Sequence, residues 1–290
     1  MKNLSVLIVN YNSAEYLRKC LLSLPKYLSG LSYECCVIDN ASEDFSDEKM
    51  ASEFSDVHFI SNSKNRGFAK AMNQGLRQTT APWVLWLNPD TELRDAHWQE
   101  CLQYFQQHPE VGILGSKIIN PDGSLQLSCR SFPSYGAALF NRYSFLTQLF
   151  PKNPFSQKYL HTDWDHATIR KVDWVSGSVL LHRREVWEDL KGLDETFFMY
   201  CEDVDFCLRA KQKGWATVYY PGTVVMHHIG KSSRHLLRKT IWERHRSIWH
   251  YYRKHFPHHL LKDAVVGFGI SLRFLFLWAL SWIRLKREGA

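Results

Sequence analysis

The sequence lacks the glycine-rich loops by which many nucleotide-binding domains hold phosphate groups. No G-x-G-x-x-G motif follows the first strand-like run, and no G-x-x-x-x-G-K-[ST] loop occurs in the 290 residues. The first absence argues against ordinary dinucleotide oxidoreduction, and the second argues against P-loop chemistry. A bound nucleotide would therefore have to be held by other groups.

Cysteine is present but shows no pattern of a disulfide framework or a zinc site. The 7 Cys form no C-x-x-C pair and are odd in number, and Cys35 and Cys36 are adjacent in an apolar run. We interpret all seven as reduced thiols of a cytoplasmic protein. Residues 1–3 lead directly into a strand-like run without a signal-peptide pattern, which fits the same compartment.

The net positive charge of the chain lies in its C-terminal tail. The whole chain has 36 Lys and Arg against 29 Asp and Glu, a net charge of +7. From Lys231 onward the count is 13 against 3, which leaves 23 against 26 in the preceding residues. Charge alone would suit a nucleic-acid arm. No recognisable binding module accompanies it, so we expect no nucleic-acid partner.

The tail also holds the longest apolar run, at about residues 264–283, with Arg273 as its single charge and basic residues after it. A run of about 20 apolar residues with aromatic side chains and basic flanks suits membrane attachment. Arg273 disfavours a simple span, so we expect an in-plane or re-entrant helix, with a helix packed on the domain as the alternative. We divide the chain into a domain at 1–232 and a basic helical tail at 233–290.

Strand-like and helix-like segments alternate through the first domain, which indicates right-handed βαβ units and a mostly parallel, Rossmann-like sheet flanked by helices. The strand-like runs are short, apolar and rich in β-branched residues, at residues 4–9, 34–38, 57–60 and 83–87. Each is followed by Asn or Asp, either at once or within a few residues, in clusters at residues 10–12, 39–40, 62–67 and 88–90. Turns favour these residues in any protein. Four clusters at the carboxyl edge of one sheet, however, favour a ligand site.

The residue types in these clusters suit a nucleoside diphosphate. Asp39 can accept the imide N–H of uracil or thymine, and Tyr11 can stack on the base. Asp90 is a hard oxygen ligand for Mg²⁺ or Mn²⁺, and His227 can complete the coordination. A lone His is more often structural, and His228 beside it leaves the choice between the two open.

Three carboxylates occupy four positions at Glu202, Asp203 and Asp205, before an apolar run. Acids are favoured at a helix N-terminus by the macrodipole. At about 100° per residue, Glu202, Asp205 and Arg209 share a helix face, and Arg209 can pair with Asp205. Asp203 has no cation at helical spacing, and such a carboxylate is available to take a proton.

The motifs together resemble the family 2 glycosyltransferases, and more narrowly their rhamnosyltransferase-like branch, over about residues 4–255. The resemblance rests on Val9-Asn10-Tyr11-Asn12, Val37-Ile38-Asp39-Asn40-Ala41-Ser42, Asn65-Arg66-Gly67-Phe68, Leu87-Asn88-Pro89-Asp90, Trp174-Val175-Ser176-Gly177, the stretch 197–209 and His227-x-x-Gly230-x-Ser232. It implies a GT-A fold, a nucleotide-diphosphate sugar donor, a divalent metal (Mg²⁺ or Mn²⁺) and inversion by direct displacement.

Carried over by position, the resemblance implies roles for individual residues. Asp203 would be the general base, and Asp90 and His227 would lie at the metal. Asn88 replaces the first acid of the family's D-x-D motif, where it can hydrogen-bond ribose or coordinate weakly. The remaining donor-binding residues would be Asn10, Tyr11, Asn12, Asp39, Asn65 and Gly67. The acceptor and sugar pocket would include Trp174, Gly177 and Glu202.

We therefore expect a metal-dependent inverting glycosyltransferase on the inner face of the cytoplasmic membrane, peripherally associated with it. Its donor would be dTDP-L-rhamnose, and its acceptor a polyprenyl-diphosphate-linked glycan of bacterial surface polysaccharide synthesis. A UDP-hexose donor is the alternative, because Asp39 can recognise either base. A non-catalytic nucleotide-sugar or glycan-binding protein is a further alternative, which the presence of a base at Asp203 disfavours.

Overall fold

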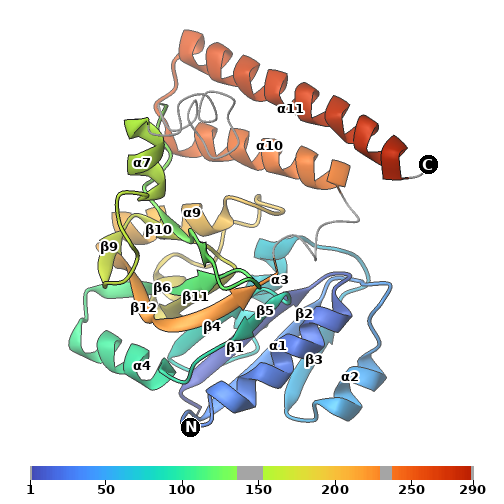
Figure 1. Cartoon of the computed structure of the whole chain (residues 1–290), viewed down its shortest axis with the longest axis vertical. Helices are drawn as coiled ribbons and strands as arrows, with labels where there is room; N and C mark the ends of the chain where they lie inside the picture. Colours follow the sequence, from blue (N-terminus) through green and yellow to red (C-terminus); the bar gives the residue numbers. More distant parts are fainter. Residues whose placement is uncertain (1, 136–152, 229–236, 289–290) are drawn as a thin grey trace.

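The computed structural model describes residues 2–135, 153–228 and 237–288, and Figure 1 shows the elements along the chain. The strands are β1 (Leu4–Asn10), β2 (Tyr33–Asp39), β3 (Val57–Ser61), β4 (Trp83–Leu87), β5 (Thr91–Leu93), β6 (Val111–Ile119), β7 (Leu125–Gln126), β8 (Cys129–Arg130), β9 (Arg170–Val172), β10 (Trp174–Val175), β11 (Val179–Arg183) and β12 (Ala216–His227). The helices are α1 (Ala14–Tyr27), α2 (Asp47–Glu53), α3 (Phe68–Leu76), α4 (Trp98–Gln107), α7 (Pro154–Leu160), α8 (Arg184–Asp189), α9 (Glu202–Gln212), α10 (Leu237–His255) and α11 (Leu260–Glu288).

A mixed sheet forms the centre of the molecule, in the order β3-β2-β1-β4-β11-β6-β12-β5. The four strands predicted from the N-terminal part of the sequence pair in parallel. β11 then runs antiparallel to both β4 and β6, and β5 runs antiparallel to β12. The prediction of an α/β fold with a sheet flanked by helices is confirmed, and its parallel part is the β3-β2-β1-β4 half together with the β6–β12 pair. The antiparallel strands were not predicted, because apolar runs carry no mark of strand direction.

Two hydrophobic cores cover the two faces of the sheet. Alternate residues of β1 point to opposite faces, as strand geometry requires. Val6 and Ile8 pack in one core with α1 and α4, whereas Leu7 and Val9 pack in the other with α3, α8 and α9. The second core supports the residues that reach the site, because α3 and α9 both begin at its edge.

β12 is longer than the sequence suggested. The strand-like run at residues 216–220 is followed by Pro221-Gly222, which reads as a turn. In the structure these residues fall within a register shift between Tyr220 and Val224, and the strand then continues to His227. A β-bulge of this kind re-aims the end of a strand, and here the strand ends at a candidate metal ligand.

The tail consists of the antiparallel helices α10 and α11, with α10 between α11 and the sheet domain (Figure 1). The ring of Phe274 on α11 packs against Trp242 and His245 of α10. Within the described residues, α11 is the one helix long and apolar enough to cross a membrane. The proposed boundary at residue 232 lies outside the described residues.

Candidate active site

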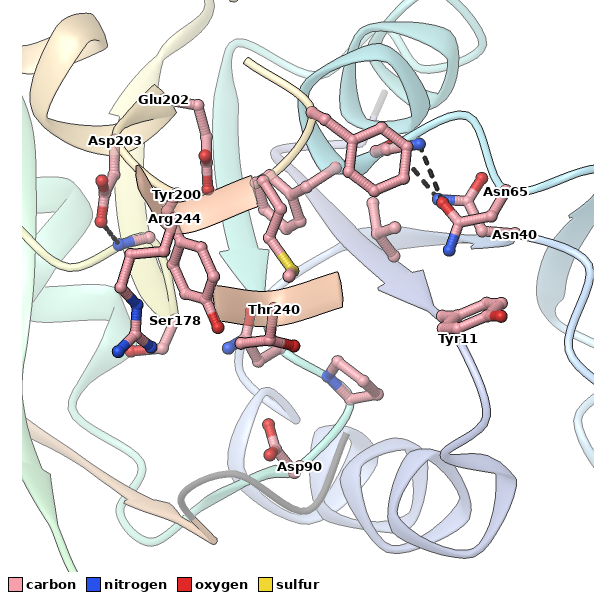
Figure 2. Close-up of a pocket in the computed structure, with 18 of the residues that line it drawn as sticks. Tyr11, Asn40, Asn65, Asp90, Ser178, Tyr200, Glu202, Asp203, Thr240 and Arg244 are labelled. Carbon is pink, nitrogen blue, oxygen red and sulfur yellow. Dashed lines mark hydrogen bonds between the residues drawn. The ribbon is translucent and has the colours of Figure 1, made fainter. Parts of the chain in front are cut away.

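A cavity of about 360 Å³ lies where the predicted polar clusters meet (Figure 2). The ends of β1 and β4 and the loops after β2 and β3 border it, together with the first turn of α9. Nine of the residues expected at the site line it: Tyr11, Asn65, Gly67, Asn88, Asp90, Gly177, Glu202, Asp203 and His227. The structure therefore brings together residues spread over more than 200 positions of the sequence.

The loop before α3 is held by contacts that only glycine permits at residue 67. Gly67 has a φ of 85°, and a Cβ there would lie 2.6 Å from the carbonyl oxygen of Phe198. Asn65 accepts a hydrogen bond of 2.9 Å from the Gly67 N–H, and Asn40 donates one of 3.2 Å to its carbonyl. Asn40 also lines the cavity. It was not among the predicted site residues, although it lies next to Asp39 in a predicted cluster.

Asn10, Asn12 and Asp39 do not line the cavity in this structure. Asp39 is almost fully buried and accepts hydrogen bonds from the Asn10 side chain at 2.7 Å and from the hydroxyl and backbone N–H of Ser42. The Asn12 N–H donates to the Ser42 hydroxyl at 2.8 Å. These contacts join the loops after β1 and β2. They place Tyr11, the residue between the two asparagines, at the cavity.

Asp90 and His227 lie together at the opposite end of the sheet edge from the nucleotide loops. His227 Nε2 is 3.3 Å from Asp90 Oδ1, and its Nδ1 is 2.8 Å from the amide oxygen of Gln126. The Gln126 amide nitrogen donates to Asn120, which fixes which end of the amide faces the histidine. In the tautomer that donates from Nδ1 to the Gln126 oxygen, Nε2 faces the carboxylate with a lone pair that a cation between the two groups could accept. Convergence of these two donors fits a divalent cation, and Gln126 orients the histidine as outer groups do at metal sites.

The structure also separates His227 from His228. His228 Nε2 is 3.0 Å from Glu92 Oε1, and its ring packs on Tyr16. Only His227 of the two lines the cavity. Among the described residues, no group of three or more His, Cys, Asp or Glu side chains forms a metal cage. An ion at Asp90 and His227 would therefore need further ligands, which a diphosphate supplies.

The acidic pair begins α9 after two residues in a strained backbone conformation. Tyr200 and Cys201 have φ values of 71° and 67°, the left-handed region that residues with a Cβ seldom adopt. Such conformations cost about 1–3 kcal/mol each and are concentrated at functional sites. Here they turn the chain sharply so that Glu202 and Asp203 both face the cavity.

Asp203 is held by backbone donors. Its Oδ2 accepts a 3.0 Å hydrogen bond from the Gly177 N–H (Figure 2). Its Oδ1 accepts one of 2.8 Å from the Val204 N–H. Burial raises the pKa of Asp203, while these hydrogen bonds and the charge of Arg130 oppose the rise. In the described part of the chain, Asp203 forms no ion pair with Lys, Arg or His.

Glu202 differs from its neighbour. It is buried, and its Oε2 has no hydrogen-bond partner among the described residues. Burial and then the charge of Asp203 raise the pKa of Glu202 to about 8. Two adjacent carboxylates thus have different environments, and the one with backbone donors is the one that more readily carries the negative charge.

Asp205 is a structural anchor. The predicted pair with Arg209 is confirmed at 2.7 Å, and Lys254 and His255 from the end of α10 also lie 2.7 Å from the carboxylate. Burial alone would raise the pKa of Asp205, but the His255 hydrogen bond and the charges of Arg209 and Lys254 lower it. The two α10 contacts were missed because a single sequence gives no sign of which distant cations meet a buried acid.

Trp174 and the basic tail, two further features of the prediction, differ in whether they reach the cavity. Trp174 is buried in the hydrophobic core, donates through Nε1 to the Ser131 carbonyl at 2.9 Å, and does not line the cavity. The basic tail contributes to the cavity directly, through Lys239, Thr240 and Arg244 of α10. These three were not predicted as site residues, since their only sequence signal was the positive charge of the tail.

The fold and the family match together define a glycosyltransferase with a GT-A fold. A mannosyltransferase structure from Pyrobaculum calidifontis, in complex with GDP-Man and Mn²⁺, matches with a TM-score of 0.56 at 15% identity, over 99% of this chain and 75% of that one. The sequence model of Glycosyl transferase family 2 matches residues 5–171.

Two curated relatives identify the branch. The N-acetylglucosaminyl-diphospho-decaprenol L-rhamnosyltransferase of Mycobacterium tuberculosis is 30% identical over 241 residues, which cover 79% of this chain and 77% of that protein. The dTDP-rhamnosyl transferase RfbF of Shigella flexneri is 24% identical over 277 residues, or 93% and 84% of the two chains. The chain belongs to glycosyl transferase family 2 and to its rhamnosyltransferase-like branch, as the sequence motifs predicted.

Proposed function

We propose that this glycosyltransferase moves L-rhamnose from dTDP-L-rhamnose, with inversion, to a hydroxyl of a polyprenyl-diphosphate-linked sugar. The names of the two rhamnosyltransferase relatives support the donor sugar, and that of the mycobacterial relative supports a lipid-diphosphate acceptor. The single observation that carries catalysis is the position of Asp203. It faces a cavity that also holds the Asp90–His227 pair, and it is held there by two backbone N–H groups.

The proposed reaction is one displacement. The acceptor hydroxyl oxygen forms a bond to the anomeric carbon of the donor while the bond from that carbon to the diphosphate oxygen breaks. Asp203 takes the hydroxyl proton, and the nucleoside diphosphate leaves with the bonding electrons. Burial and the neighbouring Asp203 charge raise the pKa of Glu202 and so favour its protonated form, which adds no second negative charge beside the base and can donate a hydrogen bond to a sugar oxygen.

Asp90 and His227 are the residues we propose to hold Mg²⁺ or Mn²⁺ with the donor diphosphate. Such an ion stabilises the negative charge of the leaving diphosphate as a Lewis acid. Asn88 borders the same part of the cavity and contributes a neutral side chain where the family's motif has a first acid. We expect this exchange to lower the affinity for metal in the absence of nucleotide.

We further propose that the protein works at the inner face of the cytoplasmic membrane, to which it attaches through α11. One side of α11 packs on α10, and Arg273 is half-buried on that side, near His245. The opposite side is exposed and apolar, with Leu261, Val265, Phe268, Leu272, Leu275, Phe276 and Trp282. This arrangement favours a helix lying in the interface over a spanning helix.

The test is a donor panel of dTDP-L-rhamnose, UDP-hexoses and GDP-mannose with purified full-length protein and Mg²⁺ or Mn²⁺. Sugar transfer to N-acetylglucosaminyl-diphospho-polyprenol is measured, with the Asp203→Asn variant as control. We expect transfer with dTDP-L-rhamnose and loss of nearly all transfer in the variant, with donor binding retained. Transfer from a UDP-hexose instead would support the alternative donor. No transfer from any donor would favour a binding protein.

A further inference from the structure

Within the part of the chain that the structure describes, the lysine and arginine side chains that line the cavity come from α10. The strand ends contribute acids, amides and small residues, while the only Lys or Arg among the lining residues of the described chain are Lys239 and Arg244. A site for one or two diphosphates needs cationic groups. The described residues of the sheet domain place no Lys or Arg at the cavity wall.

Lys239 and Arg244 differ from Arg253 and Lys254, two other cations of α10, in having no ion pair among the described residues. Arg253 pairs with Asp263 at 2.6 Å, and Lys254 pairs with Asp194 at 2.6 Å. Within the described residues, Lys239 and Arg244 pair with no carboxylate. They contact aromatic rings instead: Lys239 Nζ lies 4.9 Å from the ring centre of Phe198, and the Arg244 guanidinium lies 4.6 Å from that of Tyr200. The rings orient these cations and leave their N–H donors available.

Arg244 lies on the side of the cavity at which the acceptor is proposed to bind. Tyr200, on which it stacks, directly precedes Cys201 and the acidic pair. Figure 2 shows Arg244 on the same side of the cavity as Asp203, with Tyr11 and Asn65 on the other side. A group bound by Arg244 is therefore nearer to the proposed base than to the nucleotide loops.

We propose that Lys239 and Arg244 form the binding site for the diphosphate of the lipid-linked acceptor. This inference rests on the proposed function. Guanidinium groups bind phosphate oxygens in a bidentate manner, and an ammonium group binds them as a point charge. In the proposed acceptor the diphosphate is one sugar ring away from the attacked hydroxyl. The same helix packs against α11, so the lipid chain would run from this site toward the exposed apolar face of α11.

The test uses two acceptors with the same sugar: N-acetylglucosaminyl-diphospho-polyprenol and an N-acetylglucosamine glycoside of an uncharged alkyl chain. Wild type is compared with Arg244→Gln, Lys239→Gln and Arg244→Lys. Arg246→Gln is the matched control, because Arg246 is on the same helix and pairs with Glu243 away from the cavity lining. Circular dichroism and thermal unfolding verify that each variant is folded.

We expect Arg244→Gln to raise KM for the diphosphate acceptor about ten- to hundredfold, the range for loss of a charge-assisted contact. Lys239→Gln has a smaller effect, and Arg244→Lys regains part of the loss. Activity on the uncharged acceptor and KM for the nucleotide sugar stay within about twofold, as does every parameter of Arg246→Gln.

Two results would overturn the assignment while leaving the proposed function in place. One is an equal loss on both acceptors, and the other is a rise in KM for the nucleotide sugar alone, which would place the pair at the donor. A wild-type protein that transfers to neither acceptor from any donor would overturn the proposed function and this site together.

Discussion

The backbone N–H of Gly177 donates a hydrogen bond of 3.0 Å to Asp203 Oδ2, and a methyl group at residue 177 would lie 3.2 Å from the Asp203 Cβ. The loop between β10 and β11 thus sets the position of the proposed base from one side, and the first turn of α9 sets it from the other. Both contacts are short enough that a small shift of either backbone would change where the carboxylate points.

Gly177→Ala should therefore reduce turnover more than it reduces stability. The added methyl group displaces Asp203 by a few tenths of an ångström, and misplacement of a catalytic group by about 1 Å can cost about 100-fold in rate. We expect kcat to fall about tenfold, with KM for the donor unchanged, in steady-state assays. Gly269→Ala is the control, because a Cβ at Gly269 meets no atom within 4 Å. Wild-type kcat in Gly177→Ala would contradict this role.

Glu202 should make the protein less stable as the pH rises through the neutral range. Its pKa in the folded state is about 8, above the ordinary value of 4.5. Between these values the folded state keeps a proton that the unfolded state has lost, so the free energy of unfolding falls with increasing pH, by at most about 1.4 kcal/mol per unit. In Glu202→Gln this dependence should flatten. Thermal unfolding from pH 5 to 9 measures it, and parallel curves for the two proteins would refute the assignment.

Asp205→Asn should destabilise the whole protein. The fully buried carboxylate joins Arg209 on its own helix to Lys254 and His255 of α10. Removing one partner from a buried ion pair costs about 3–5 kcal/mol, because the remaining charges lose their compensation. We expect a loss of about that size at pH 7, measured by urea denaturation.

The pH dependence gives a second check on Asp205. Because its pKa is lowered on folding, the stabilisation is present above the ordinary pKa and is lost as the pH falls through the lowered value. The difference between wild type and Asp205→Asn should therefore shrink in acid. Asp56→Asn, at an exposed position, should change stability by less than about 0.5 kcal/mol at either pH.

Metal affinity should depend on Gln126 through His227. The Gln126 amide oxygen lies 2.8 Å from His227 Nδ1 and so holds the ring with its other nitrogen, Nε2, facing Asp90. Outer groups of this kind contribute about 10–100-fold to metal affinity. We expect Gln126→Leu to weaken Mn²⁺ binding about tenfold and His227→Ala to weaken it more, in titrations with nucleoside diphosphate present. Glu92→Gln is the control, because Glu92 pairs with the neighbouring His228 and with Arg94 and does not contact His227. Unchanged Mn²⁺ affinity in both variants would exclude this pair as the metal site.

The sequence predicted those parts of the site that lie at strand ends, because the end of each strand can be recognised locally. Apolar runs followed by Asn or Asp gave the clusters at Tyr11, Asn65 and Asp90, because parallel strands must end at one edge. Helical spacing predicted the Asp205–Arg209 pair, because its two residues are four positions apart on one helix. Arg244, Lys254 and His255 were missed, since each contacts a residue more than 40 positions away in the sequence.

Burial was the other property that the sequence did not reveal. Asp39 and Asp203 are both acids near strand or helix ends, and both suit ligand binding by type. Only the structure shows that Asp39 is enclosed by Asn10 and Ser42, whereas Asp203 borders the cavity. The type of a residue limits which groups its side chain can bind. The packing of the neighbouring loops determines which groups it contacts in the folded protein.

The exposed face of α11 should determine whether the protein binds membranes. Phe268 and Leu272 lie one turn apart on this face, with exposed fractions of 70% and 58%. Replacing both by Glu removes apolar area and adds negative charge without disturbing the side of α11 that packs on α10. We expect the double variant to lose most of its co-sedimentation with vesicles of phosphatidylethanolamine and phosphatidylglycerol. Its unfolding temperature and its kcat on a short-chain soluble acceptor should stay near wild type.

The control for added charge is Leu22→Glu, which changes an exposed leucine on α1, far along the chain from the tail. Full vesicle binding by the double variant would show that α11 is not the attachment surface. Loss of folding in the double variant but not in Leu22→Glu would show that this face is covered by protein in solution, and the membrane assignment would then fail.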